Sequence, residues 1–487
     1  MFGYVSNIFY LYAIVLCMTH EETPQVSMED IISLCKRRGF IYQGSEIYGG
    51  LAGTWDYGPL GVMLKDSIKR IWWNRFVDSR LDMYGVDAAL LMNPKVWVSS
   101  GHVGGFADPL VEDLKTKKRY RADHLIEEKG LSVAGKSVAE MTEMIKEQGI
   151  KSPEGNPLGD VRQFNMMFKT NIGAIESEDS ISYLRPETAQ GMFVNFKNIQ
   201  DTFHPKLPFG MAQIGKAFRN EIAPRDFVFR VREFEQMEIE YFVNPNLDAS
   251  HESSWQKVFE SFRKEVWSFI KDIGLDESKL HELEIGDGDR AHYSARTIDF
   301  EYDFPFGKKE LYGLAYRTDF DLKAHTEGSK VDLSYFDEEA KQRYIPHCIE
   351  PSFGLDRTVL AVLATAYRTD MLGGEERVYL KLSPAVAPYR IAVFPLLKNK
   401  PELIAKAKEV WEMLRKAATA KGLSGAKVCY DEVGSIGKRY RRQDEIGTPM
   451  CITVDFDTLE KGTVTVRDRD TGEQKVVKVD EVGNLLN

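Results

Sequence analysis

Residues 218–241 read FRNEIAPRDFVFRVREFEQMEIEY. A short segment that ends at Arg219 and Glu221 meets a proline-containing loop, and a run with period two begins near Phe229. Successive strand side chains point to opposite faces, so the run predicts one mostly apolar face and one polar face with a single aromatic, Phe234. Such a polar face needs water or a polar ligand. The stretch predicts either a salt-bridged edge hairpin or a ligand platform, with arginines for phosphates, an aromatic for a stacked base and carboxylates for an ammonium group.

Length and composition limit the classes of protein that this chain can be. It has 487 residues and is 43% hydrophobic, so we expect two or three domains. A net charge of −10 argues against a nucleic-acid-coating protein that is basic over its whole surface, although it allows a local basic patch. Five cysteines include no CxxC pair and no metal-ligand spacing, which favours a reducing compartment, the cytoplasm, and no zinc site.

The N-terminal segment is the one unusual feature. Residues 8–18 are nearly all apolar, about the length of a signal-peptide core and too short to span a membrane. No Lys or Arg precedes them, and no small-x-small cleavage site follows before Thr19. We interpret residues 1–27 as an appended or over-extended start, with secretion as the alternative. No other stretch could cross a bilayer, so we expect no membrane partner.

Several segments predict the first domain. A capped helix is expected over 28–39, and the glycine-rich aromatic loop at 44–61 lacks the GxxxxGK[ST] pattern of a Walker phosphate loop. Apolar residues at helical spacing predict a helix over 62–77, whose aromatic side chains favour packing on something large, such as another subunit. A strand is expected over 86–92. Residues from about 105 to 165 are rich in charged side chains and contain scattered glycines, which predicts an inserted subdomain.

Two features of the middle of the chain have ordinary explanations when each is taken alone. Residues 117–121 hold four basic side chains in five, and such a run is more often a solvated face than a binding site. The segment 183–190, YLRPETAQ, has a proline that can open a helix, with Glu187 in its first turn. On this evidence Glu187 is a helix-start carboxylate.

The best domain boundary is the proline-punctuated segment 382–388. Beyond it, strands alternate with a helix over 403–417, which predicts a small α/β domain. The basic cluster at 437–442, GKRYRR, contains an aromatic residue and is an unspecific signal for contact with RNA.

Three motifs in order resemble those of the class II aminoacyl-tRNA synthetases. Arg219-Asn-Glu221, a loop, and then Phe234 and Glu238 are similar to motif 2. Residues 354–357, GLDR, enter an apolar helix as motif 3 does, and the helix over 62–77 followed by a strand resembles the weak motif 1.

Four shorter segments, YGGL, LRPETAQ, FEQME and IEPSFG, narrow the resemblance to glycyl-tRNA synthetases of the homodimeric type, from about residue 28 to the end. The resemblance implies an α+β catalytic domain over 28–387, with an antiparallel sheet flanked by helices and an inserted subdomain at about 105–165. It implies an anticodon-binding domain over 388–487. The implied partners are ATP, glycine, both the acceptor end and the anticodon of tRNA(Gly), and a second copy of the chain.

The implied reaction joins glycine and ATP into glycyl-adenylate with release of pyrophosphate, and then transfers glycine to tRNA(Gly) with release of AMP. Such chemistry needs alignment and charge neutralisation more than covalent help. By resemblance Arg219 and Arg357 are catalytic, at the α- and γ-phosphates, and Phe234 stacks on adenine. Glu221 either accepts from the adenine amine or orients Arg219, and Glu310 is a candidate Mg²⁺ ligand. The implied ATP-binding residues are Arg219, Asn220, Glu221, Phe229, Arg230, Val231, Arg232, Glu233, Phe234, Glu310, Leu311, Gly354, Leu355, Asp356 and Arg357.

The amino-acid pocket is the part that should select glycine. Glu350 and Ser352 stand where motif 3 usually has glycines, on the strand face of Gly354, so they shrink the pocket and offer oxygens to an ammonium group. The methyl group of alanine would clash, and overpacking a rigid site costs on the order of 1–3 kcal/mol. Glycine has no smaller competitor, so no editing domain is expected. The implied glycine-binding residues are Arg121, Glu187, Phe234, Glu235, Gln236, Met237, Glu238, Glu350, Pro351, Ser352, Phe353 and Gly354.

Two alternatives belong to other classes. One is a catalytically inactive, synthetase-like protein that only binds nucleic acid, which need not keep phosphate-binding arginines, whereas Arg219 and Arg357 are both present. The other is a different class IIa synthetase, such as a prolyl or threonyl enzyme, whose larger amino acid would collide with Glu350 and Ser352. The roles of Arg230 and Arg232 stay open between phosphate and tRNA.

Overall fold

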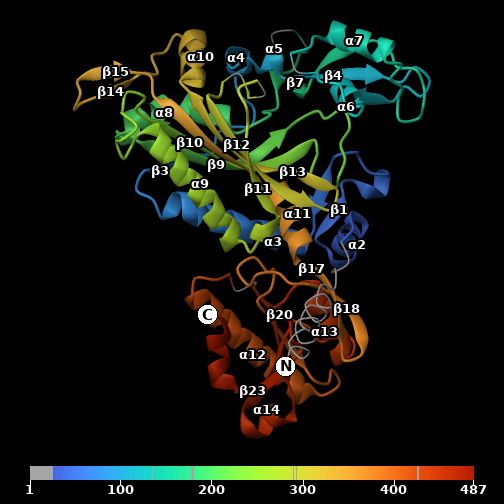
Figure 1. Cartoon of the computed structure of the whole chain (residues 1–487). Coiled ribbons are helices and arrows are strands. Elements are labelled where there is room, and N and C mark those ends of the chain that lie inside the picture. The colour runs from blue at the N-terminus through green and yellow to red at the C-terminus, as the bar shows by residue number, and fades with distance from the viewer. Residues whose placement is uncertain are drawn as a thin grey trace, which may run out of the picture.

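The computed structural model describes residues 26–486 apart from 134, 176, 178, 179, 289, 292, 425 and 426. The apolar N-terminal run at 8–18 therefore lies outside the described residues. Figure 1 shows a larger body built on one long sheet and a smaller body, coloured orange to red, near the end of the chain. None of the described helices is long and apolar enough to cross a membrane.

A seven-stranded sheet forms the centre of the larger body, in the order β11-β12-β13-β16-β10-β9-β3. Its strands are β3 (Met83–Gly85), β9 (Phe209–Phe218), β10 (Glu233–Val243), β11 (Leu280–Glu284), β12 (Arg296–Phe304), β13 (Gly307–Thr318) and β16 (His347–Gly354). All neighbours are antiparallel except β3 and β9, which run parallel at one edge. The predicted α+β fold, an antiparallel sheet flanked by helices, is confirmed.

The two faces of this sheet are covered differently. The largest apolar core joins one face to the helices α3 (Pro59–Trp73), α9 (Trp255–Asp272) and α11 (Leu355–Ala366). A separate core joins the other face to the helices α8 (Ala189–Phe203) and α10 (Phe320–Ser329). This second core includes Phe242 but stops short of Phe234 and Glu238, which line a cavity. One end of the second face is therefore open.

Strand β10 shows the predicted alternation but begins later than expected. Apolar side chains at odd positions between Met237 and Val243 lie in the core. The strand starts at Glu233 and not near Phe229. Asp226 and Phe227 have positive φ values of 59° and 58°, so the chain turns tightly before the strand begins. Phe229 is buried in the core and anchors this turn, which explains why apolar residues alternate here without forming a strand.

The helix predicted over 62–77 is α3, which starts earlier and continues as a π turn. Its aromatic side chains Trp72 and Phe76 are fully buried in the chain's own core. Their ring centroids lie 5.9 Å and 5.3 Å from that of Phe353 on β16. The aromatic character of this helix therefore gives no support for a second subunit.

Two other N-terminal predictions had different outcomes. The predicted capped helix is α2 (Met28–Arg38), and of the two candidate caps, Ser27 and Asp30, Ser27 is the cap residue. The strand predicted over 86–92 is wrong, because the paired strand is β3 just before it. The Arg185 guanidinium donates to the carbonyl oxygen of Ala88 at 2.8 Å, so a side chain fixes this segment where a neighbouring strand was expected.

The region predicted as an insertion forms its own three-stranded sheet, in the order β5-β4-β6, at the upper right of Figure 1. Its elements are β4 (Ala107–Glu112), β5 (Arg119–Arg121), α6 (Ala122–Glu127), α7 (Val138–Glu147) and β6 (Arg162–Asn165), and they share a small apolar core. The remaining elements of the larger body are short: β1 (Ile41–Gln43), β2 (Trp55–Tyr57), α4 (Pro94–Ser99), α5 (His102–Gly105), β7 (Lys169–Asn171), β8 (Ile181–Tyr183), β14 (Tyr335–Asp337) and β15 (Gln342–Tyr344).

The smaller body follows a hairpin of β17 (Tyr367–Leu372) and β18 (Glu375–Leu380). It contains a five-stranded sheet in the order β20-β19-β21-β22-β23, in which β20, β19 and β21 are parallel. Its elements are β19 (Ile391–Pro395), α12 (Pro401–Ala420), β20 (Val428–Tyr430), α13 (Ile436–Glu445), β21 (Met450–Val454), α14 (Phe456–Lys461), β22 (Thr463–Asp468) and β23 (Gln474–Lys478). The sequence did not reveal α13, α14 or β23.

Ion pairs join the smaller body to the larger one. Arg377 of β18 is fully buried and binds Asp370 with two hydrogen bonds of 2.8 Å and 2.6 Å. It also donates to Asp444 of α13 at 3.2 Å. Glu445 of the same helix contacts Arg38 at the end of α2. Removing one partner of a buried pair leaves an uncompensated charge, so these contacts hold the junction in one arrangement.

Candidate active site

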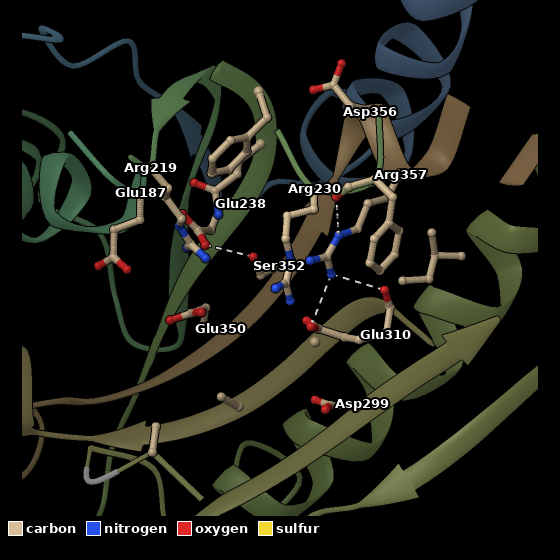
Figure 2. A pocket seen from close by; sticks show the side chains of 18 of the residues that line it. Glu187, Arg219, Arg230, Glu238, Asp299, Glu310, Glu350, Ser352, Asp356 and Arg357 are labelled. Atoms are coloured by element: carbon tan, nitrogen blue, oxygen red, sulfur yellow. Dashed lines mark hydrogen bonds and ion pairs between the residues drawn. The ribbon is translucent and has the colours of Figure 1, made fainter. Parts of the chain in front are cut away.

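A cleft of about 580 Å³ opens on the uncovered end of the sheet face, beside the start of α8. Figure 2 shows its polar side chains in two groups, with Arg230 between them. Glu187, Glu238, Glu350 and Ser352 form one group, and Arg357, Glu310 and Asp299 form the other. The predicted residues that line the cleft are Arg121, Glu187, Arg219, Glu221, Phe229, Arg230, Val231, Phe234, Glu235, Gln236, Glu238, Glu310, Leu311, Glu350, Ser352, Gly354, Asp356 and Arg357.

Cross-strand pairing places the first group. Glu238 of β10 stands opposite Ser352 of β16, and the Ser352 hydroxyl donates to its carboxylate at 2.8 Å. The Thr188 hydroxyl donates to the other oxygen at 2.5 Å. Glu187 lies before α8, which begins at Ala189, so the prediction that Glu187 stands in the first turn of a helix is wrong. Free of the helix, Glu187 reaches the cleft.

A buried chain of hydrogen bonds connects Glu187 to Glu350. Arg317 contacts the Glu350 carboxylate and binds Asp321 through two hydrogen bonds of 2.8 Å and 2.9 Å. The Gln190 amide donates to Asp321 at 2.9 Å and to Glu187 at 3.0 Å. Arg317 is only 2% exposed and stands where the pairing of β13 with β16 shifts register. Two carboxylates that are far apart in the sequence are thereby fixed relative to each other.

The carboxylate group contains more negative than positive charge. Burial raises the pKa of Glu350 to about 8, since Glu238 and Glu187 add to the shift and Arg317 only partly opposes it. Burial and Glu187 raise the pKa of Glu238. Burial opposes ionisation of Glu187 as well, but His102 and Arg317 outweigh it and hold the pKa of Glu187 below the usual range. A cation that bound among these carboxylates would displace the protons that they otherwise retain.

Glu240, one pleat beyond Glu238, is fully buried behind this group. Its Oε2 accepts from the Cys348 thiol at 2.9 Å, and no described residue hydrogen-bonds to its Oε1. Burial and the nearby Glu350 raise the pKa of Glu240 well above its usual range. Its surroundings therefore favour the neutral form of the Glu240 carboxyl group.

Two arginines in the cleft lie over aromatic rings. The Arg219 guanidinium is 5.3 Å from the ring centroids of both Phe234 and Phe106, and its Nε donates to the Pro186 carbonyl at 3.1 Å. Arg219 forms no ion pair with the residues that the structure describes, so its charge is available to a ligand. Among the described residues, no contact joins the side chains of Glu221 and Arg219, so the expectation that Glu221 orients Arg219 has no support here. The other expectation, that the Glu221 carboxylate accepts from the adenine amine, stays a prediction.

The second arginine stands at the other end of the cleft. Arg357 lies over the Phe229 ring at 4.4 Å and donates to the carbonyl and Oε2 of Glu310, both at 3.1 Å. Burial, together with Glu310 and Glu301, raises the pKa of Asp299 to about 7. Within the described ranges, no three His, Cys, Asp or Glu side chains are grouped closely enough to hold a metal ion by themselves.

Comparison with known proteins identifies the family. Residues 168–366 match the tRNA synthetase class II core domain (G, H, P, S and T), and residues 390–487 match the anticodon binding domain. A glycine–tRNA ligase of Acetivibrio thermocellus is 50% identical over 465 residues, covering 94% of this chain and 97% of that protein. Glycine–tRNA ligases of Bacillus cereus and Clostridium kluyveri are 48% and 49% identical, each covering 94% of this chain and 98% of the relative. The chain belongs to the glycine–tRNA ligases.

As a glycine–tRNA ligase, the chain is a class II aminoacyl-tRNA synthetase that uses ATP to attach glycine to tRNA. The sequence analysis left two alternatives, an inactive protein that only binds nucleic acid and a synthetase for a larger amino acid. The similarity supports neither, because these relatives are ligases and their amino acid is glycine. The class II core match covers the strands that carry Glu238 and Glu350 and the helix α11 that carries Arg357, so the cleft stands in the catalytic domain of the family.

Seven of the predicted ligand residues do not line the cleft of this glycine–tRNA ligase: Asn220, Arg232, Glu233, Met237, Pro351, Phe353 and Leu355. Met237 and Phe353 point into the core on the opposite face of the sheet, as strand alternation requires. Arg232 donates to the Ala52 carbonyl at 2.6 Å and thereby holds the glycine-rich loop. Strand alternation therefore turns part of each predicted run of residues away from the cleft.

The structure also adds residues to the site that the sequence did not predict. His102 contacts Glu187 at 3.4 Å, and Arg317, Asp321 and Gln190 form the hydrogen-bonded chain behind the carboxylates. Gln190 belongs to the LRPETAQ segment, which was a signal that the site lies nearby. The others had no local signal, because a single charged residue in an apolar strand or helix is visible only after folding.

Proposed function

We propose that the cleft performs both steps of glycine ligation, with the glycine ammonium among the carboxylates and the adenine at the Arg357 end. The observation that carries this proposal is the buried group of Glu187, Glu238 and Glu350, which has more negative than positive charge. A small cation satisfies such a group, and Glu350 and Ser352 line the cleft, where we expect their side chains to narrow the pocket against an amino acid with a side chain.

In the first step, a glycine carboxylate oxygen forms a bond to the α-phosphorus of ATP, and the bond from that phosphorus to the bridging oxygen of pyrophosphate breaks. The carboxylate is already ionised, so no base is needed. Arg219 stands next to the carboxylate group and is free of ion pairs among the described residues, which suits it to the α-phosphate. In the second step, a hydroxyl of the 3′-terminal ribose attacks the carbonyl carbon and AMP leaves.

For the base, we place adenine on Phe234, with Arg357 over its other face. Phe234 and Glu238 lie on the same face of β10, four residues apart, which is roughly 13 Å along a strand. That span leaves room for the phosphate and ribose between the ammonium site and the base. Arg357 follows Gly354, which pairs with Gln236, so it reaches the same end of the cleft. A planar guanidinium can stack on the base and still turn an edge to the γ-phosphate, the predicted partner of Arg357.

Asp299 and Glu310 fit a Mg²⁺ ion that is bound chiefly by phosphates. Glu310 adds to the burial that raises the pKa of Asp299, and a cation would relieve that repulsion. Mg²⁺ commonly takes one or two carboxylates and completes its shell with phosphate oxygens and water, so a larger protein cage is not needed. When bound, it would neutralise phosphate charge.

We also propose domain limits of 28–387 and 388–487, an insertion at about 105–165 and a cytoplasmic location. The family matches at 168–366 and 390–487 support the division into two domains. The four described cysteines are free thiols, which suits a reducing compartment.

The proposal can be tested by pyrophosphate exchange into ATP with single amino acids. Exchange should depend on glycine and be about 5-fold to 150-fold weaker with alanine, serine or proline, because overpacking a rigid pocket costs on the order of 1–3 kcal/mol. Comparable exchange with alanine would show that Glu350 and Ser352 do not limit the pocket.

The position of the base can be tested with two variants of the cleft's phenylalanines. Phe234→Ala should raise the KM for ATP about tenfold, since stacking on a base contributes roughly 1–3 kcal/mol, and Phe234→Tyr should restore it. Phe229→Leu is the matched control, because it keeps the core filled and removes only the ring beneath Arg357. A larger rise in the KM of the Phe229 variant than of Phe234→Ala would move adenine to Phe229.

Glycine affinity should depend on pH. The pKa of Glu350 is about 8 in the free protein, and a bound ammonium favours the ionised carboxylate. Glycine must therefore displace a proton below pH 8, so its affinity should rise by up to about tenfold per pH unit between pH 6 and 8 and then level off. Calorimetry in two buffers of different ionisation enthalpy measures the released proton. Glu350→Gln should remove this dependence, and a flat profile for the unaltered protein would contradict the charge assignment.

The proposed homodimer has a candidate interface at the β3 edge of the sheet. Among the described strands β3 pairs only with β9, and Leu81 beside it is fully exposed, with Leu91 half-exposed nearby. An apolar sheet edge is a common site of association. Sedimentation equilibrium should give twice the mass of one chain, and Leu81→Asp should lower it. Leu283→Asp, at the opposite sheet edge, is the matched control and should leave the dimer intact.

A further inference from the structure

One carboxylate continues the pairing of β10 where its neighbouring strand ends. Gln236 stands opposite Gly354, the last residue of β16. One position earlier on β10, β16 has given way to α11, and the backbone N–H of Glu235 donates to the Asp356 carboxylate at 2.7 Å. Asp356 is the second residue of α11 and is only 5% exposed. A buried side chain of α11 therefore fixes the first residues of β10.

The residues next to this hydrogen bond form the two sides of the proposed adenine site. Phe234 precedes Glu235, and Arg357 follows Asp356. In Figure 2 the Arg357 side chain extends towards Glu310, whereas the Asp356 side chain extends away from it. The hydrogen bond thus joins the backbone that carries Phe234 to the backbone that carries Arg357. Movement at this bond would change the width of the gap that the base must fill.

Lys65 of α3 contacts both residues that form this hydrogen bond. Its ammonium group lies 2.8 Å from the Glu235 carboxylate and 3.2 Å from the Asp356 carboxylate. It also lies 4.1 Å from the ring centroid of Tyr57, and the Tyr57 hydroxyl donates to the same Asp356 oxygen at 2.5 Å. We call these four residues, Tyr57, Lys65, Glu235 and Asp356, the Lys65 cluster. The cluster connects β2, α3, β10 and α11 through one ammonium group.

The charges of the Lys65 cluster depend on one another. Lys65 is only 6% exposed. Burial opposes its charge, but Asp356 and Glu235 outweigh burial and raise the pKa of Lys65. Burial also opposes ionisation of Glu235, but Lys65 and then Lys69 outweigh it and lower the pKa of Glu235. Without Lys65 the two carboxylates would repel each other in a buried place, so the backbone segments that carry them would move apart.

We propose that Lys65 is a positioning residue for ATP, because it sets the gap between Phe234 and Arg357. It does so by holding Glu235 against Asp356. Lys65 is not among the residues that line the cleft, so it acts through these neighbours and does not touch the nucleotide. The inference rests on the proposed placement of adenine between the Phe234 ring and the Arg357 guanidinium.

The test measures the KM for ATP and the KM for glycine in pyrophosphate exchange by the full chain. Lys65→Met should raise the KM for ATP about tenfold, which is within the range of coupling between groups of one hydrogen-bonded network. The KM for glycine should stay unchanged, because Arg317 and not Lys65 contacts Glu350. A variant that only folded less well would lose kcat at an unchanged KM, since fewer molecules would be active. Equal rises in the two KM values would overturn the proposal.

Two milder variants test the same cluster without leaving a buried carboxylate unpaired. Lys65→Arg keeps the positive charge and should recover part of the affinity for ATP that Lys65→Met loses. Tyr57→Phe keeps the ring beside Lys65 and removes one hydrogen bond to Asp356. It should raise the KM for ATP by up to about fivefold, the effect of one hydrogen bond. An unchanged KM for ATP in Tyr57→Phe, together with no recovery in Lys65→Arg, would contradict the proposal.

Lys69→Met is the matched control. Lys69 stands one turn further along α3, where it contacts Asp66 at 3.1 Å and Glu235 at 3.5 Å, and no contact with Asp356 is found among the described residues. This variant loses the same charge from the same helix but keeps the contacts of Lys65. Its KM for ATP should therefore stay close to that of the unaltered protein. A rise as large as that of Lys65→Met would reduce the effect to net charge and overturn the proposal.

A double-mutant cycle separates this inference from the proposed function. In the Phe234→Ala background, Lys65→Met should add little to the KM for ATP, because two changes that disturb one contact are not additive. Additive effects would show that Lys65 acts elsewhere, and they would overturn the inference while leaving the proposed function intact. Absence of glycine-dependent exchange in the unaltered chain would instead contradict the proposed function and, with it, this inference.

Discussion

The pairing of β10 with β16 places the carboxylates of these two strands together at one end of the cleft, where we propose that glycine binds. Glu238 and Ser352 face each other across these strands, and Glu350 follows one pleat along β16. A shift of one residue on either strand would send these side chains into the apolar core and bring Met237 or Phe353 into the cleft. The large aromatic core on the other face therefore holds the register, and with it the position of the carboxylates.

Charge in the cleft is stabilised by different means at its two ends. At the end that holds Glu238 and Glu350, Arg317 and Asp321 form a buried ion pair, and burial with the neighbouring carboxylates raises the pKa of Glu350. Beyond it, Arg219 rests on aromatic rings and forms no ion pair with the described residues, whereas Arg357 rests on the Phe229 ring and also pairs with Glu310. One part of the cleft is thus suited to a positive group and the other to negative groups. This order agrees with the proposed placement of the glycine ammonium group and the phosphates of ATP.

Local patterns predicted the features that depend on neighbours in sequence. The alternation along β10, the Ser27 cap and the linker before β19 are of this kind. The turn at Asp226 and Phe227 could not be predicted, because apolar alternation also suits a residue that anchors a loop in a core. No local pattern indicated that Arg317 and Asp299 belong to the site, since their partners lie on other strands. A register shift between two strands cannot be recognised from amino-acid composition. The resemblance identified segments that form the cleft, but not which alternate residues face it.

The buried ion pairs between Arg377, Asp370 and Asp444 have a consequence for the substrate. Through Asp444 they tie the smaller body to the β17–β18 hairpin, and the contact of Arg38 with Glu445 ties it to α2, so the separation of the cleft from the anticodon binding domain is set by the protein. With a tRNA bound both at the cleft and at the anticodon binding domain, the enzyme acts as a gauge of fixed length. An RNA whose arms were longer by a turn of helix would satisfy one end of the gauge only, however well its bases matched.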